Sequence, residues 1–574
     1  MNMQTRKLYL LLIFFLIFLP GCVQAKQKTL SFNILNEFDT QSPVDNQLLT
    51  MPENAVAPKF TFEGRLELLN EADNGSISYL RYGSGLGAEA NYLPDFDFEF
   101  VQNGNYIIPE QQGLIITTHP LWNYILEPGQ VWQESNDKFY SRASLPFFLI
   151  PKNGNSTFHG VMTFLYNDTN MSKVWYQITQ ETSAYERADL WGLLEATYHP
   201  GSVDGSAEIQ NGFTQELAQR VPTKPFAQIE KDYPGVKASA FIKKLTPEHL
   251  TTYGLIVNGV HYRGGCQTRY GEYPFCEFIR MPSFSTAKSA FVSLALMRLA
   301  QKYGPQVADQ LIKDYVTETV ISPGDWSKVT FDNTLDMATG NYNTPDFMVD
   351  EEARIFEDFI GVESYAEKIA AALDWPHRAE PGTRWVYRSS DTFIVTAALQ
   401  NYLRTKEGPD ADLFDFVVRE VYQPAGLGPG VFSTLRTSDH NWRGQPVGVM
   451  GMWWIPDDIA KLAIFLNTNR GAVNGEQILH PALLASAMQA DPADRGLNTP
   501  SGKYNNAFWA DYFTQADGFD CEFYVPYWAG YSGIVVALMP NGVTFYYFSD
   551  NREFDWRDAV HEADKIKPLC PSTQ

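Results

Sequence analysis

A serine and a lysine stand three residues apart at the head of an apolar stretch. Ser285 and Lys288 open residues 284–300, FSTAKSAFVSLALMRLA, in which most later residues are apolar. Residues at this spacing share one face of a helix, so the hydroxyl and the amine can meet. A helix N-terminus stabilises a nearby oxyanion, and burial lowers the pKa of a lysine until it can accept a proton. The pair therefore predicts a serine nucleophile activated by a lysine base.

The S-x-x-K spacing is not specific by itself. It also occurs at Ser135 and Lys138, in the polar turn ESNDKF, where no apolar helix follows. For Ser285 the competing interpretation is a helix N-cap, followed by a lysine whose ammonium group reaches solvent. The choice depends on whether other segments bring further reactive groups to the serine.

The elements that would position this pair follow from the patterns on either side of it. Asn258 with Gly259, and Asn541 with Gly542, each separate two apolar runs, which is a strong β-hairpin signal. Strands at both ends of a domain with helices between them predict an α+β fold, in which an antiparallel sheet is flanked by helices. The expected helices are 284–303, 305–319, 363–374, 391–404, 412–422, 456–468 and 480–489.

Four segments after Ser285 carry a resemblance to a known family. They are VTFDNTLDMATGNY (329–342), PGTRWVYRSSDTFIVTAAL (381–399), GVMGMWWIPDDIAKLAIFL (448–466) and WAGYSGIVVALMPNGVTFYYFSDN (528–551). In this order they resemble the β-lactamase-related serine hydrolases, which include class C β-lactamases, penicillin-binding-protein-like enzymes and family VIII esterases. The resemblance implies a β-lactamase/transpeptidase-like fold and does not extend to residues 1–235.

The resemblance also implies roles for single residues. Ser285 matches the nucleophile of the family, Lys288 its general base and Tyr387 the tyrosine that relays the proton. A phenol close to a lysine is expected to have a lowered pKa. The backbone N–H groups of Ser285 and Tyr531 would form the oxyanion hole.

Two positions depart from the pattern of the family. Ser389 stands where the Y-x-N motif has the asparagine that holds a substrate's acylamide group, so it is expected to face the substrate. Trp528 and Gly530 bound the triplet that stands for K-T-G or H-x-G, and they are expected at the substrate site as well. An indole in place of a cation favours an apolar ester or amide over a β-lactam or peptide carboxylate. Arg388 is expected to be a surface charge, with a substrate-binding cation as the alternative, and Asp391 a helix cap.

The N-terminus predicts export. Arg6 and Lys7 precede the apolar run 8–20, which is too short to span a bilayer comfortably. The run ends in LPGC, which resembles a lipobox and predicts lipidation of Cys22; an ordinary signal peptide or an uncleaved anchor is the alternative. Val23 after this cysteine indicates the outer membrane. The expected location is the cell envelope, with a lipid anchor in the membrane.

The remaining cysteines support export into an oxidising compartment. An even number of cysteines there suggests disulfides, and local pairing is expected because each pair closes a short segment, although other connectivities stay open. The cysteines are Cys266, Cys276, Cys521 and Cys570.

The expected organisation has five parts. Residues 59–200 show short β-branched and aromatic runs between turn clusters, which predict an all-β sandwich or jelly roll. Its tryptophans are expected in the core, with a carbohydrate platform as the alternative. The parts are a signal peptide (1–22), a tether (23–58), the all-β domain (59–200), a linker (201–235) and the hydrolase-like domain (236–574).

Other classes of function are disfavoured. The net charge of -23 and the lack of a Lys/Arg-rich run argue against a nucleic-acid partner. The sequence has no phosphate-binding loop, zinc helix or G-x-S-x-G elbow, so no metal or cofactor is expected. The sequence predicts an envelope serine hydrolase that cleaves a small ester or amide through an acyl-enzyme. A β-lactamase or D,D-peptidase of the same fold, and a non-catalytic envelope binding protein, remain the alternatives.

Overall fold

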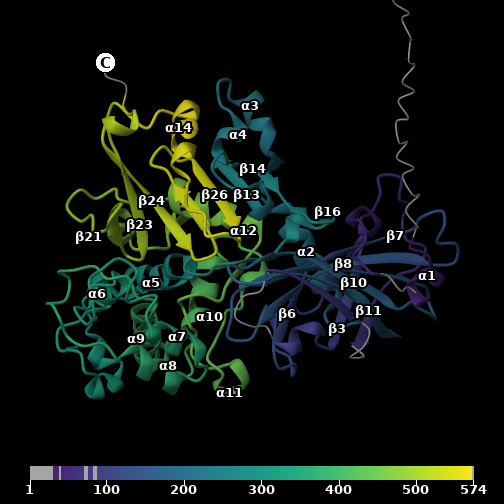
Figure 1. Cartoon of the computed structure of the whole chain (residues 1–574), viewed down its shortest axis with the longest axis horizontal. Helices are drawn as coiled ribbons and strands as arrows, with labels where there is room; N and C mark the ends of the chain where they lie inside the picture. Colours follow the sequence, from purple (N-terminus) through teal and green to yellow (C-terminus); the bar gives the residue numbers. More distant parts are fainter. Residues whose placement is uncertain (1–29, 38–40, 70–74, 82–86, 572–574) are drawn as a thin grey trace, which may run out of the picture.

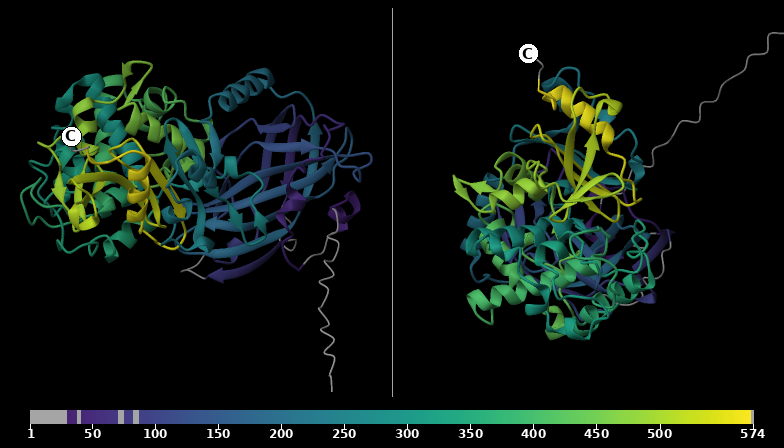
Figure 2. Two further views of the ribbon diagram at one scale, coloured as in Figure 1. Left: turned by 90° about the horizontal axis from the view of Figure 1, so that it is seen from above. Right: turned by 90° about the vertical axis from the view of Figure 1, so that its left-hand side faces the viewer.

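The computed structural model describes residues 30–37, 41–69, 75–81 and 87–571. Two lobes lie side by side, one built from the N-terminal third of the chain and the other from the rest (Figures 1 and 2). The expected signal peptide and Cys22 lie outside the described residues. Within the described ranges, no helix has the length and apolarity needed to cross a membrane.

The N-terminal lobe is an antiparallel 11-stranded sheet. Its order is β5-β6-β8-β7-β4-β3-β1-β11-β10-β9, with β2 added on β11. The strands are β1 Gly64–Leu69, β2 Gly75–Arg81, β3 Phe96–Asn103, β4 Tyr106–Pro109, β5 Gly113–Ile115, β6 Trp122–Leu126, β7 Gly129–Trp132, β8 Ser141–Pro151, β9 Thr157–Tyr166, β10 Val174–Thr182 and β11 Arg187–Pro200.

This sheet closes into a barrel and is not the expected sandwich or jelly roll. One edge of β8 pairs with β9, and its other edge pairs with β7 and β6. The strands β8-β7-β4-β3-β1-β11-β10-β9 therefore form a ring that closes on β8. The long β8 makes this closure possible because two short strands share one of its edges. Trp122, Trp132 and Trp175 are buried, as expected for core residues, so they offer no platform for a carbohydrate.

The second lobe contains a nine-stranded sheet, flanked by helices, with strands from both ends of the lobe. This confirms the α+β class. Asn258 (φ 50°) and Gly259 (φ 73°) form the expected hairpin turn, because both adopt the left-handed conformation of a type I′ turn. The order is β12 (Thr223–Pro225), β14 (Val260–Gly265), β13 (Leu250–Val257), β26 (Thr544–Ser549), β25 (Ile534–Leu538), β24 (Phe523–Gly530), β23 (Phe508–Phe513), β22 (Gly502–Asn505) and β21 (Leu497–Asn498).

Most of the expected helices are present, with one exception. The stretch 305–319 forms three short 3-10 turns, because its backbone bonds leave the segment: Ile312 donates to Val329 and Gln310 accepts from Phe331. The main helical elements are η6 Lys288–Ser293, α5 Leu294–Tyr303, α6 Phe331–Leu335, α7 Arg354–Gly361, α8 Tyr365–Ala372, α9 Ser389–Glu407, α10 Leu413–Val417, η10 Val418–Tyr422, α12 Pro456–Ala463, η12 Ile464–Thr468, α13 Pro481–Ala487 and α14 Arg557–Ile566.

Two segments expected to be connectors are folded onto the body. In the expected tether, α1 (Phe32–Glu37) contacts β9, and Leu35 and Leu49 are fully buried. In the expected linker, α2 (Ser206–Ala218) packs on β3 and β4, and β12 already belongs to the second sheet. Apolar residues in both segments therefore serve as packing contacts.

The two expected local disulfides, Cys266–Cys276 and Cys521–Cys570, are both formed. No cluster of potential metal ligands occurs within the described ranges.

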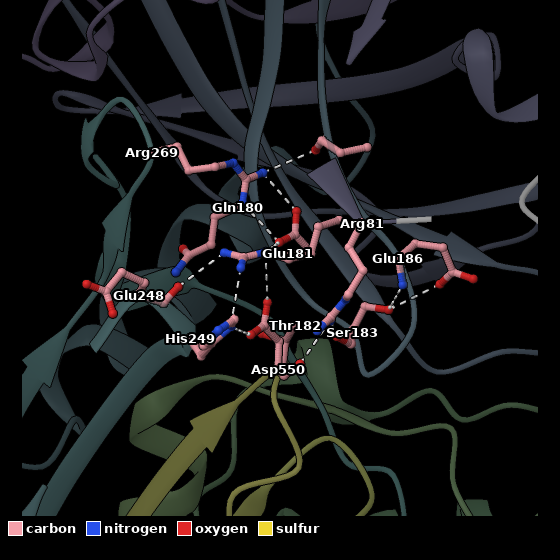
Figure 3. A network of polar contacts seen from close by, with 12 residues as sticks. Arg81, Gln180, Glu181, Thr182, Ser183, Glu186, Glu248, His249, Arg269 and Asp550 are labelled. Atoms are coloured by element: carbon pink, nitrogen blue, oxygen red, sulfur yellow. Dashed lines mark hydrogen bonds and ion pairs between the residues drawn. The ribbon is translucent and has the colours of Figure 1, made fainter. Parts of the chain in front are cut away.

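A buried ion-pair network joins the two lobes (Figure 3). Glu181 on β10 is fully buried and accepts hydrogen bonds from Arg269 Nη1 at 2.9 Å and Nη2 at 2.8 Å. Arg187 contacts Glu181 at 3.3 Å and Asp550 at 3.5 Å, and His249 Nδ1 lies 2.6 Å from Asp550 Oδ1. The carboxylates of the interface are therefore held by cations from both lobes.

We expect Arg269→Ala to lower the free energy of unfolding by about 3–5 kcal/mol, because it leaves the buried Glu181 short of one partner. Urea denaturation measures this loss. Lys328→Ala is the matched control: Lys328 and Glu380 pair at 3.1 Å with both side chains exposed. Its effect should stay below about 0.5 kcal/mol. Equal effects of the two variants would contradict the assignment of the network to the interface.

Candidate active site

Ser285 and Lys288 meet as the spacing predicts. Lys288 Nζ lies 2.6 Å from Ser285 Oγ and 3.4 Å from the carbonyl oxygen of Val449. The lysine is 1% exposed, whereas Ser285 is half-buried. Burial lowers the pKa of Lys288 to about 8, and the negative charge of Glu351 opposes this effect. A large share of the amine is therefore uncharged in mildly basic solution, and an uncharged amine can accept the hydroxyl proton.

The turn that carries Ser285 is held by a short two-stranded sheet. Strand β17 (Met281–Pro282) pairs with β18 (Trp453–Trp454). Next to it, Ser283 N donates to Met452 O at 2.8 Å and Met452 N donates to Ser283 Oγ at 3.1 Å. Phe284 then takes a φ of 39°, which costs a residue other than glycine about 1–3 kcal/mol. Ser285 thus follows a strained residue that its surroundings must hold in place.

Tyr387 joins the pair from the segment that leads into α9. Its phenol lies near the Ser285 side chain, whose influence partly offsets the rise in the pKa of the phenol. Its ring centroid lies 5.3 Å from Lys288 Nζ. The structure therefore brings together the three residues that the sequence singled out for nucleophilic chemistry.

The expectation about the pKa of Tyr387 is wrong. Burial, and then the negative charge of Glu351, raise its pKa well above the ordinary value of a phenol. The lysine does not reverse this because it is itself largely uncharged above about pH 8. Tyr387 is therefore a neutral phenol, suited to donate a proton rather than to remove one.

Glu351 is the residue that the sequence did not reveal. It is buried and accepts a hydrogen bond from Ser389 N at 2.7 Å and another from Ser389 Oγ. Burial raises its pKa, whereas the charge of Lys288 lowers it. No motif surrounds Glu351 in the sequence, so only the packing of its loop against the start of α9 shows the role. Ser389, which was expected to face the substrate, instead bonds to this carboxylate.

Arg388 is not the expected surface charge. It is 1% exposed, donates to Thr339 Oγ1 at 2.7 Å and stacks over the Trp375 ring at 5.1 Å. Its ion-pair partner is Asp391, whose side chain is fully buried. Asp391 therefore neutralises an internal cation, and the expected helix cap is replaced by this pair.

The end of β24 packs directly against the turn that carries Ser285. A Cβ atom on Gly530 would lie 2.9 Å from Ser283 O, so only glycine allows this close approach. The ring of the next residue, Tyr531, lies 6.4 Å from that of Phe284. In the described part of the chain, no hydrogen bond engages the amide N–H of Ser285 or of Tyr531. Both amides are thus free to donate to an oxyanion.

The position of Trp528 differs from the expectation. The residue is fully buried and packs against Phe508, with ring centroids 6.0 Å apart. A fully buried indole cannot form a wall for a substrate. It also leaves this position without a cation.

Other aromatic side chains surround Tyr387. Its ring stacks on Trp509 at 5.3 Å and lies 6.2 Å from Trp385. Trp385 in turn stacks on Phe347 at 6.0 Å, and Phe347 is 54% exposed. These side chains form a continuous aromatic row from the surface to Tyr387. A cavity of about 480 Å³ lies elsewhere, around Arg404 and Asp439, and contains none of these residues.

Comparison with family models and with curated proteins gives no match. Among solved structures, the chain is similar to EstCE1, described as a hydrolase with promiscuous acyltransferase activity (16% identity, TM-score 0.42, covering 61% of this chain and 98% of that chain). It is also similar to a penicillin binding protein from Bacillus halodurans (15%, 0.41, covering 59% and 99%) and a D-stereospecific amidohydrolase from Streptomyces sp. (12%, 0.38, covering 56% and 96%). At TM-scores this low the similarities do not carry function over to this chain.

We expect the nucleophilicity of Ser285 to follow the charge of Lys288. The rate constant for its reaction with a fluorophosphonate should rise with pH and level off above a midpoint near pH 8, because the base must be uncharged. Glu351→Gln keeps the contacts with Ser389 and removes a charge that raises the pKa of Lys288. The midpoint should then move by roughly one pH unit to lower pH. An unchanged or higher midpoint would show that Glu351 does not act on the lysine.

Proposed function

We propose that this protein is a serine hydrolase that cleaves an ester or amide bond through an acyl-enzyme on Ser285. The observation that carries the proposal is the 2.6 Å contact between Ser285 Oγ and the buried Lys288 Nζ, with the ring centroid of Tyr387 5.3 Å from the same amine. A nucleophile, a base with a lowered pKa and a neutral proton donor thus surround one space. Acyl transfer requires such a set.

In the proposed acylation, protons pass between Ser285, Lys288 and Tyr387. The uncharged amine of Lys288 takes the proton of Ser285, and Oγ forms a bond to the carbonyl carbon. The amides of Ser285 and Tyr531 donate to the oxyanion that develops on the carbonyl oxygen. When the intermediate collapses, Tyr387 protonates the departing alcohol or amine, and the ammonium of Lys288 returns a proton to the phenolate. Lys288 is then uncharged again.

In the proposed deacylation, water is the nucleophile and Ser285 is the leaving group. A water molecule gives a proton to Lys288 and adds to the acyl carbon as hydroxide. The bond to Oγ breaks, the acid departs, and the ammonium of Lys288 restores the hydroxyl of Ser285. Protons and charges balance over the cycle, so no metal or cofactor is required by this scheme.

The rival reading is a binding protein that retains the fold without catalysis. Burial of an amine disfavours its charged form, and a scaffold gains nothing from this cost. The phenol of Tyr387 is buried beside the same lysine, which adds a second titratable group at the site. These contacts favour the enzyme.

The proposed substrate is an ester or amide with an apolar group. Trp528 supplies no cation for a carboxylate, and the aromatic row from Phe347 to Tyr387 offers apolar rings next to the nucleophile. A β-lactam or D-amino-acid peptide is the second candidate, and it needs a cation that the Trp528 position lacks.

We expect a fluorophosphonate probe to label the protein on Ser285, as located by peptide mass spectrometry. Ser285→Ala should remove the label, while Ser289→Ala, which alters a buried serine bonded to Ala507 O, should retain it. A folded wild-type protein that takes no label, or a Ser285→Ala variant labelled like wild type, would support the binding reading. Short-chain p-nitrophenyl esters should be hydrolysed faster than nitrocefin; the reverse order would select the β-lactam candidate.

The envelope location is proposed from the N-terminal sequence. Two disulfides in the folded part are consistent with an oxidising compartment. Labelled palmitate should enter the protein when it is expressed in a Gram-negative host, and Cys22→Ser should abolish incorporation. Undiminished incorporation in the variant, or no incorporation into the wild type, would contradict lipidation at Cys22.

A further inference from the structure

One loop of the barrel lobe contacts residues 283–285, the turn that leads to Ser285 and is called the nucleophile turn below. This loop, residues 152–156, connects β8 to β9, and its Asn155 is 2% exposed. Its Oδ1 accepts from Ser283 Oγ at 3.0 Å and from Phe284 N at 2.5 Å. Its Nδ2 donates to Met452 O at 3.1 Å. All three contacts lie on the residues that set the backbone immediately before Ser285.

These contacts meet a specific need of the turn. Phe284 has a positive φ, and its N–H has no backbone acceptor among the described residues. Asn155 Oδ1 satisfies that N–H and the hydroxyl of Ser283 together. An amide can accept twice with its oxygen while its nitrogen donates, whereas a carboxylate lacks the donor and a hydroxyl is too short. The side chain therefore matches the three groups it joins.

The loop is itself fixed on both sides. Asn153 Nδ2 donates to Ile360 O at 2.8 Å and to Val362 O at 3.1 Å, at the end of α7. Ser156 Oγ donates to Ser183 Oγ at 3.0 Å, which ties the loop to the turn between β10 and β11. Asn153 and Ser156 therefore contact other elements, and Asn155 is the residue of this loop that bonds to the nucleophile turn.

The neighbouring barrel turn also reaches the site. Tyr185 lies with its ring 5.6 Å from that of Tyr531. Arg552 covers the Tyr531 ring at 4.4 Å. Two barrel loops therefore lie next to the nucleophile turn. One contacts Phe284 and the other contacts Tyr531.

We propose that Asn155 is a positioning residue for Ser285, so that the barrel lobe is part of the catalytic unit and not a separate binding module. This rests on the proposed role of Ser285 as nucleophile. Asn155 acts through Phe284: it holds the strained backbone that directs Oγ toward Lys288 and the amide of Ser285 toward the oxyanion. It does not touch the substrate.

The test compares Asn155→Ala with Asn153→Ala in the full chain. Both variants remove an amide from the same loop and the same interface, but only Asn155 contacts the nucleophile turn. We expect Asn155→Ala to lower the fluorophosphonate labelling rate constant, and kcat on a p-nitrophenyl ester, by about 10- to 100-fold, because a small displacement of a reacting atom has this effect. KM should change by less than about twofold, since no substrate contact is lost. Asn153→Ala should stay within about twofold of wild type in all three quantities.

A second measurement does not depend on activity. Hydrogen exchange of a peptide covering 281–288 should be faster in Asn155→Ala than in wild type, because the Phe284 N–H loses its acceptor, and unchanged in Asn153→Ala. If Asn155→Ala does not fold, Asn155→Ser serves with the same expectations. Labelling of the Asn155 variant within twofold of wild type, equal losses in both alanine variants, or unchanged exchange would overturn the inference. A wild-type protein that never labels would instead refute the function proposed for Ser285.

Discussion

The burial of one amine beside one hydroxyl is the constraint on which the rest of the site depends. Lys288 is almost inaccessible to solvent and its pKa falls to about 8. A decrease of this size from the ordinary 10.5 corresponds to about 3 kcal/mol of lost stability at neutral pH, where the buried amine is still protonated. The loss diminishes as the pH rises from 8 toward 10.5, because the unfolded chain then releases its proton as well. The packing of the second lobe must offset this cost. The result is an amine beside Ser285 that can accept a proton.

The groups around Lys288 tune this balance in opposite directions. The apolar packing of η6 favours the neutral amine, whereas the buried Glu351 favours the ammonium. Burial keeps the phenol of Tyr387 protonated by raising its pKa, and the same carboxylate adds to this effect. One anion thus acts on both proton carriers, and it is held by the Ser389 contacts at the start of α9. The N-terminal barrel also holds the second lobe in place. It does so through Asn155, which bonds to the turn before Ser285, and through the ion pairs around Glu181 and Asp550 (Figure 3).

The sequence predicts what local chemistry decides. The one-turn spacing of Ser285 and Lys288, the Asn-Gly hairpin turns and the short disulfide loops depend on neighbouring residues, and the structure contains each of them. Contacts that depend on long-range packing could not be predicted from the sequence. Closure of the barrel depends on which edge of β8 meets β9, and the fates of Arg388 and Trp528 depend on what covers them. Glu351 has no motif at all, because its role comes from proximity to residues far along the chain. The three-residue convergence at Ser285 was predictable only because separate segments resembled one family pattern.

The pKa of Lys288 is the quantity that tests this account most directly. NMR of the protein carrying ¹³Cε-labelled lysine, with the resonance assigned by Lys288→Arg, can follow its protonation without any substrate or probe. The account predicts a titration midpoint near pH 8. A lysine that remains charged beyond pH 10 would contradict it, since such an amine could not take the proton of Ser285 under physiological conditions.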